Sequence, residues 1–305
     1  MKKFALKYFV FFALIGLFVF TALPMFLKGW VDEYYIHFLR SGKSLVIGSS
    51  RAAQGLSSEE ISKGYGKNFD MENFGFGAAV SSYGPVYFDA IKEKVAASNE
   101  QELFILEVNP WTITCEKNNV NDDEAMFPEA SGFIAKQWLY NSNPNLEFIL
   151  RNKTPLYPFF INRNKGNEVF SSDEHSRLVV NVPMDSISVK NRLLASNDRF
   201  EKQCNDSKFS AKRMKYLNET VKYLSSKGKV VLVRMPIDPS VLVIENKLLH
   251  NFNELMQSVA AANKALYLNY SDSTSMAITT DGTHLFNDAA KKFSLRLGAD
   301  IKSKL

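Results

Sequence analysis

The pattern of hydrophobic and polar positions begins with a long apolar run at the N-terminus. From Tyr8 to Leu27 the run contains no charged residue and is apolar on every face of a helix. About 20 such residues are needed for an α-helix to cross the hydrocarbon core of a bilayer. Lys2, Lys3 and Lys7 precede the run. The positive-inside rule therefore places the N-terminus in the cytoplasm and the bulk of the chain outside it, in the periplasm or the extracellular space.

A cleaved signal peptide is the other interpretation of this run. The apolar region of a signal peptide is shorter, and the sequence after Phe20, Thr-Ala-Leu-Pro-Met, is not a good small-x-small cleavage site. We therefore expect a retained single-pass anchor over residues 1–30, followed by a short connecting stalk over residues 31–43.

Beyond the stalk, short apolar runs bounded by turn residues alternate with helical patterns. The apolar runs predict five buried strands, at residues 44–48, 70–76, 103–108, 229–235 and 265–270. The helical patterns cover residues 83–97, 211–226, 243–262 and 287–302. Continuous apolar strands that alternate with helices are typical of a parallel sheet covered on both faces. The sequence thus predicts a doubly wound, flavodoxin-like α/β domain of three layers over residues 44–305.

One stretch, residues 111–206, breaks this rhythm. It is rich in Asn, Pro, Ser and aromatic residues, and it includes Pro155-Leu-Tyr-Pro-Phe-Phe. A connection of this length inside a compact domain usually has structure of its own or serves function. We interpret it as an inserted subdomain or lid beside the site.

Polar residues follow four of the five predicted strands. Residues 48–51 read Gly-Ser-Ser-Arg, residues 73–77 read Asn-Phe-Gly-Phe-Gly, Asn109 follows the third strand, and residues 281–284 read Asp-Gly-Thr-His. Ligands of a parallel α/β sheet bind outside the carboxyl ends of its strands, so we expect these side chains to lie close together. A hydroxyl, an Asp/His pair, flexible backbone N–H groups and an amide are the groups that nucleophilic acyl transfer requires.

Each group has a chemical role in that reaction. The Ser50 hydroxyl is a weak nucleophile that needs a base, which His284 can provide. Asp281 can hold the imidazole in the correct tautomer and stabilise its cation. The oxyanion of the tetrahedral intermediate needs donors, and the candidates are the backbone N–H of Ser50, that of Gly75 or Gly77, and the side-chain amide of Asn109.

This order of Gly-x-Ser, Asn-x-Gly, strand-end Asn and late Asp-x-x-His resembles the SGNH/GDSL hydrolase superfamily, from residue 44 to the C-terminus apart from the insertion. The resemblance implies the same roles for Ser50, Gly75 or Gly77, Asn109, Asp281 and His284. The sequence departs from the family at Ser49, where many members have Asp, and at Glu107-Val-Asn-Pro110, which lacks the usual Gly-x-Asn-Asp.

The Gly-Ser-Ser block behind an N-terminal anchor is more similar to membrane-tethered members of the superfamily. These include the D-alanyl transfer protein of teichoic acid modification and the SGNH-like proteins of alginate O-acetylation. That similarity implies a role in modifying a surface polymer.

Three further residues are candidates for substrate contacts. Arg51 can bind an anionic group or form a structural ion pair. Trp111 can stack on a sugar ring or pack in the core. Arg234 can line the crevice or pair with Asp238.

Cysteine and charge patterns limit the remaining possibilities. Cys115 and Cys204 either form a disulfide or remain two free thiols, because pairing cannot be deduced from sequence. No grouping of residues has metal-ligand spacing, so we predict no metal and no cofactor. The net charge of +5 is spread along the chain, whereas nucleic-acid binding requires clustered basic residues, and we predict none.

The leading hypothesis is a serine-dependent esterase or O-acyltransferase that acts on acyl groups, in the first place acetyl, of an extracytoplasmic glycan or other surface polymer. Transfer would require an integral membrane partner that brings acyl groups across the bilayer. The departures at Ser49 and Pro110 keep an alternative open, a catalytically inactive scaffold or binding subunit of a surface-polysaccharide machine.

Overall fold

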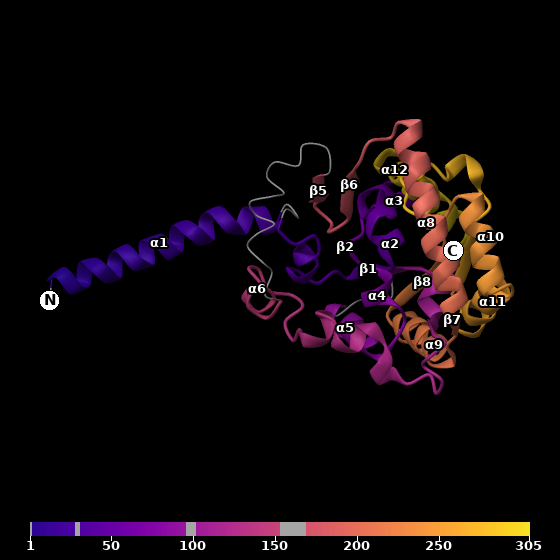
Figure 1. Cartoon of the computed structure of the whole chain (residues 1–305), viewed down its shortest axis with the longest axis horizontal. Helices are drawn as coiled ribbons and strands as arrows, with labels where there is room; N and C mark the ends of the chain where they lie inside the picture. Colours follow the sequence, from indigo (N-terminus) through magenta and orange to yellow (C-terminus); the bar gives the residue numbers. More distant parts are fainter. Residues whose placement is uncertain (1, 28–30, 96–101, 153–168) are drawn as a thin grey trace.

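A five-stranded parallel sheet forms the centre of the domain (Figure 1). The computed structural model describes residues 2–27, 31–95, 102–152 and 169–305. The strand order is β2-β1-β3-β8-β9, which is the flavodoxin-like order of a doubly wound sheet. The strands are β1 (Ser44–Gly48), β2 (Met71–Gly75), β3 (Glu102–Glu107), β8 (Gly228–Arg234) and β9 (Leu266–Asn269).

Helices cover both faces of the sheet, which confirms the predicted three layers. Leu45 and Ile47 of β1 face one helical layer and Val46 faces the other, and all three side chains are fully buried. The first layer contains α5 (Pro85–Lys94), α9 (Ala211–Ser225) and α11 (Phe252–Ala262). The second contains α2 (Ser50–Gly55), α3 (Ser58–Tyr65) and α12 (Asn287–Lys304). Burial on both faces explains why the strands read as continuous apolar runs.

The predicted helix at 243–262 is two helices in the structure. α10 (Pro239–Leu248) ends where Leu249 leaves the helical backbone region, and α11 begins at Phe252. The break allows both Glu245 and Phe252 to contact the Arg234 side chain, the first by an ion pair and the second with its ring 5.0 Å from the guanidinium. The last residues of the helix predicted at 83–97 lie outside the described residues, and α2 and α3 were not predicted.

The N-terminal helix α1 (Lys2–Leu27) is long and apolar enough to cross a membrane, with a mean hydropathy of 2.5 over an 18-residue window. It projects from the domain (Figure 1), and only its last turns are buried, at Ala22 and Phe26. The Phe26 ring lies 5.5 Å from that of Tyr35.

The segment predicted as a stalk, residues 31–43, belongs to the domain core. Its short 3₁₀ helix η1 (Tyr35–Phe38) buries Tyr35, His37 and Phe38 completely or almost so. The Phe38 ring packs 4.8 Å from that of Phe148. A stalk would leave these large apolar rings in water, so their burial drives the segment onto the domain.

The insertion leaves and rejoins the domain at one point. There β4 (Thr114–Glu116) pairs antiparallel with β7 (Ser207–Phe209), directly after the short η2 (Pro110–Ile113). Its other elements are η3 (Glu124–Met126), η4 (Pro128–Ser131), η5 (Ile134–Lys136), α6 (Leu146–Arg151), the hairpin β5 (Val169–Ser172) and β6 (Leu178–Asn181), and α8 (Ser186–Asp206). The Pro155–Phe160 motif lies outside the described residues.

The two cysteines remain free and buried, so the disulfide alternative is wrong. Cys204 on α8 directs its sulfur at the Ile244 carbonyl, 3.9 Å away. Cys115 on β4 instead interacts with the Asp122 carboxylate. The two thiols therefore have different neighbours.

Candidate active site

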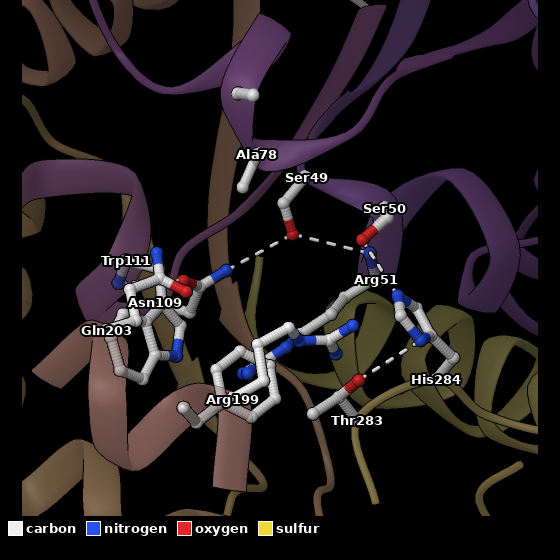
Figure 2. Close-up of a pocket in the computed structure, with 12 residues that line it drawn as sticks. Ser49, Ser50, Arg51, Ala78, Asn109, Trp111, Arg199, Gln203, Thr283 and His284 are labelled. Atoms are coloured by element: carbon white, nitrogen blue, oxygen red, sulfur yellow. Dashed lines mark hydrogen bonds between the residues drawn. The ribbon is translucent and has the colours of Figure 1, made fainter. Parts of the chain in front are cut away.

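A hydroxyl, an imidazole and a carboxylate form a hydrogen-bonded chain at the carboxyl edge of the sheet. Ser50 Oγ lies 2.8 Å from His284 Nε2, and His284 Nδ1 lies 2.8 Å from Asp281 Oδ2. Figure 2 shows the Ser50 and His284 side chains pointing toward each other. Ser50 is the first residue of α2 after β1, whereas Asp281 and His284 lie in the turn before α12. Folding thus brings together the groups of a nucleophile, its base and an orienting acid.

The Asp281 carboxylate is held by several donors. Its Oδ1 accepts the backbone N–H of Thr283 and of His284 and the Thr283 hydroxyl, each at 3.0 Å. Burial raises the pKa of this carboxyl, but the hydrogen bonds from His284 and Thr283 outweigh burial and hold the pKa below its ordinary value. Asp281 is therefore ionised at neutral pH and fixes the imidazole ring.

A second polar cluster lies directly behind the Ser50–His284 pair. Glu107 is fully buried at the end of β3, and its Oε2 accepts both the backbone N–H and the hydroxyl of Ser49, at 2.9 and 2.8 Å. The Asn109 amide donates to Glu107 Oε1 at 2.6 Å and to the Ser49 hydroxyl at 3.2 Å. The Ser49 oxygen also accepts the Arg51 N–H and caps α2. The cluster fixes the turn that presents Ser50.

Gly48 makes this approach of Glu107 possible. Its φ of +145° is a backbone conformation that favours glycine. A Cβ atom at Gly48 would lie 2.7 Å from the Glu107 Cβ. Any larger residue would push the carboxylate away from Ser49.

The structure does not bring Gly75 or Gly77 to the nucleophile. The Gly75 N–H donates to the Asn73 side chain at 3.0 Å, and a Cβ there would lie 2.8 Å from the backbone nitrogen of Ala53. Gly75 is a glycine because α2 crosses it closely, which corrects the expectation that it supplies an oxyanion donor. Gly77 lies against the Tyr34 hydroxyl and hydrogen-bonds to it.

The next residue, Ala78, lines the cavity (Figure 2), whereas Gly75 and Gly77 are not among its lining residues. It is the first residue of the short helix α4 (Ala78–Ser81). Asn109 also lines the cavity, with its amide engaged by Ser49 and Glu107. The backbone N–H of Ser50 begins α2 at the same wall.

The cavity beside Ser50 has a volume of about 410 Å³. One wall comes from α8 of the insertion, which contributes Arg199, Phe200 and Gln203 (Figure 2). The Phe200 ring stacks on the Trp111 ring with centroids 5.1 Å apart. These α8 residues were not predicted from the sequence. The one feature of the sequence that could have indicated them is their helical spacing, which places residues 199, 200 and 203 on one face of a helix.

The three predicted substrate-contact residues meet at Glu245, which is fully buried on α10. Its carboxylate lies 2.6 Å from Arg51 Nη2 and 3.0 Å from Arg234 Nη2, and it accepts the Trp111 indole N–H at 3.0 Å. Arg51 and Trp111 also line the cavity, but Arg234 is not among its lining residues.

Asp238 forms the N-cap of α10. The predicted pairing of Arg234 with Asp238 is thus replaced by an ion pair with Glu245. Across the residues that the structure describes, no group of three or more His, Cys, Asp or Glu side chains is placed to hold a metal ion.

Neither a protein-family model nor a curated protein matches this sequence. Among solved structures the chain is similar to an inhibitor-bound aryl esterase of M. smegmatis, with 11% identity, a TM-score of 0.39, and coverage of 86% of this chain and 99% of that one. It is similar to Est24, a carbohydrate acetylesterase from Sinorhizobium meliloti, with 12% identity, a TM-score of 0.39 and coverage of 87% and 97%. It is also similar to phospholipase A1 from Streptomyces albidoflavus NA297, with 13% identity, a TM-score of 0.38 and coverage of 87% and 100%. At these values, function has to be inferred from the chain's own side chains.

Proposed function

We propose that this protein is a serine-dependent ester hydrolase or O-acyltransferase of the SGNH type, anchored by α1 and acting on acyl groups, in the first place acetyl, of a cell-surface glycan. The observation that carries the proposal is the chain from Ser50 Oγ through His284 to Asp281, which opens into a cavity. A hydroxyl, an imidazole and an ionised carboxylate in this order are the groups that serine-dependent acyl transfer uses.

The geometry supports a two-step reaction. The Ser50 oxygen attacks the ester carbonyl carbon as its proton passes to His284 Nε2, and Asp281 stabilises the resulting imidazolium. His284 then returns the proton to the leaving alkoxide as the C–O bond breaks, which leaves an acyl group on Ser50. A water or sugar hydroxyl, deprotonated by His284, releases that acyl group as an acid or a new ester.

The oxyanion of each tetrahedral intermediate requires donors at the wall that Ser50 shares with Ala78. We assign this role to the backbone N–H groups of Ser50 and Ala78, because both residues line the cavity and both begin a helix. Asn109 then acts as a positioning residue through Ser49 and Glu107.

The shape of the cavity supports an extended substrate. It adjoins a second cavity of about 260 Å³, and the two share Ala78, Ala79, Trp111 and Gln203. The second cavity adds the exposed amide of Asn118, beside that of Gln203, and the Phe127 ring. Amides that bond hydroxyls, next to aromatic rings, suit a chain of sugar units. An anchor would hold the site near the membrane, where an integral membrane partner could supply acyl groups for transfer.

A labelling experiment tests the proposal on the full chain in nanodiscs. A fluorophosphonate probe should label the native protein and the exposed control Ser303→Ala, but not Ser50→Ala. Ser50→Ala and His284→Ala should also lose hydrolysis of a small acetyl ester. Equal labelling of the native protein and Ser50→Ala would overturn the enzyme assignment. The scaffold alternative would be favoured if the probe does not label the native protein and if cells that carry Ser50→Ala or His284→Ala have the same phenotype as cells with the native protein. Adding an oligosaccharide acceptor and measuring acetyl transfer against acetate release separates the two reactions.

A further inference from the structure

The last turns of α1 pack against the domain. Phe26 is buried in the domain core, and Leu23, Met25 and Leu27 pack against that core. Most of the helix before these residues is exposed, as a membrane span would be. If α1 spans a bilayer, as the anchoring part of the proposed function states, the surface around its last turns must lie at the lipid headgroups.

Helix α6 lies at this end of the domain. Tyr35 contacts Phe26 of α1 on one side and Phe148 of α6 on the other, with ring centroids 5.5 and 5.6 Å apart. Figure 1 shows α6 on the same side of the domain as the emerging end of α1, and α10 on the opposite side.

The outward face of α6 is apolar and exposed. Leu146 and Leu150, one helical turn apart, are 58% and 77% exposed, while Phe148 on the other face is buried. Trp138 and Leu139, in the loop packed on α6, are 75% and 53% exposed. We define these four residues, Trp138, Leu139, Leu146 and Leu150, as the α6 patch.

Two charged side chains beside the α6 patch, Glu147 and Arg151, are already paired. The Glu147 carboxylate accepts the backbone N–H groups of Trp138 and Leu139 and forms an ion pair with Arg151. The Arg151 guanidinium lies 4.4 Å from the Trp138 ring. A tryptophan beside an arginine, next to exposed leucines, is the combination found where proteins meet the membrane interface.

We propose that the α6 patch docks on the outer surface of the bilayer that α1 spans, with Leu146, Leu150 and Trp138 inserted at the headgroup level. The α6 patch lies next to the end of α1, so we expect lipid, and not another protein, to cover it. Asp89 and Glu93 line a neighbouring depression with Trp138, so the contact depends on apolar insertion and not on attraction to anionic lipid. It should therefore form on pure phosphatidylcholine.

The test places an environment-sensitive fluorophore on one introduced cysteine at a time, in the full chain in nanodiscs of phosphatidylcholine, with one copy per disc. Leu150→Cys reports the α6 patch. Val243→Cys on α10, 67% exposed and at the opposite end of the domain, is the matched control, and Leu14→Cys reports insertion of α1. The unsubstituted chain, whose cysteines are both buried, measures background labelling.

Brominated acyl chains should quench the fluorophore at positions 14 and 150 and leave position 243 unchanged. Quenching at 14 without quenching at 150 would overturn the docking proposal while the anchor stands. A blue-shifted but unquenched fluorophore at 150 would mean that protein covers the patch, which also overturns it. Absence of quenching at position 14 would overturn both the anchoring of the chain by α1 and the docking of the α6 patch. The ester assay of the same samples reports the active-site proposal separately.

Discussion

The Ser49 hydroxyl donates to the Glu107 carboxylate across 2.8 Å, at the wall of the cavity beside Ser50. These are the two places at which the sequence departs from the SGNH pattern, and the structure joins them. The carboxylate that many members carry beside the nucleophile is absent at position 49, and β3 supplies one from the other side. Ser49 and Glu107 therefore form one connected departure, whereas Pro110 lies outside this contact.

Glu107→Gln should destabilise the fold by about 1–3 kcal/mol, because an amide NH₂ would replace an oxygen that now accepts from Ser49 or Asn109, leaving donors unpaired. Urea unfolding of the full chain in detergent micelles measures this change. Glu116→Gln, at an exposed glutamate of β4, is the control. Equal unfolding midpoints for the two variants would contradict the role given to Glu107.

Ala78→Pro should lower kcat for a small acetyl ester by about 10²–10³-fold, which is the usual effect of losing one oxyanion donor. Proline removes the backbone N–H, and the first position of a helix tolerates it. Gly77, with φ −62° and ψ 146°, already has the backbone that a residue before proline needs. Ala78→Gly keeps the N–H and should retain activity. Similar kcat values for Pro and Gly would exclude Ala78 as a donor.

Glu245→Gln should destabilise the fold by about 3 kcal/mol, because Arg51 and Arg234 would share no buried counter-charge. Arg51 directly follows Ser50, so kcat should fall as well. Lys247→Ala, on the same helix as Glu245, breaks a solvent-exposed pair with Glu201 of α8 and should leave chemical unfolding almost unchanged. A Glu245→Gln variant as stable as Lys247→Ala would show that the network contributes little.

His37→Phe should reduce the loss of stability in acid. Burial, together with the nearby Lys94 ammonium, lowers the pKa of His37 to about 3. Between that value and about 6.5 the unfolded chain binds a proton that the folded chain does not, so stability is full above pH 6.5 and falls as the pH drops. Phenylalanine suits the surrounding rings of Tyr34 and Phe76 and removes this proton uptake.

The measurement for His37 compares urea unfolding at pH 7.5 and pH 4.5. The decrease in unfolding free energy over this range should be about 2–3 kcal/mol smaller in His37→Phe than in the native chain. His250→Gln, at an exposed histidine, should behave like the native chain. The same acid sensitivity in all three proteins would show that His37 does not carry it.

The sheet was predictable because each strand is a local signal. Leu45, Val46 and Ile47 form an uninterrupted apolar run since helices cover both faces, and such runs end at turn residues. The order of polar residues after the strands likewise predicted that Ser50 and His284 would meet, although 234 positions separate them. Both predictions need only the topology of a parallel sheet.

The rest depends on side-chain contacts between distant segments. Nothing local to Glu245 reveals that two arginines and a tryptophan from three other elements converge on it. A glycine that donates to an oxyanion and a glycine that makes room for a helix cannot be told apart in sequence. The role of Gly75 follows from the close approach of α2, which is a tertiary contact. The burial of Tyr35 and Phe38 was missed for the same reason, since their partners lie in β2 and in the insertion.

The Phe26–Tyr35 contact has a practical consequence for preparing this protein. The core is completed by a side chain from the hydrophobic helix, so removing that helix opens a hole beside Tyr35 instead of releasing a finished soluble domain. A truncated secretion product would expose aromatic rings and tend to aggregate. The last turns of α1, through Phe26, are thus part of the folding unit, and any shortened form of the protein has to retain them.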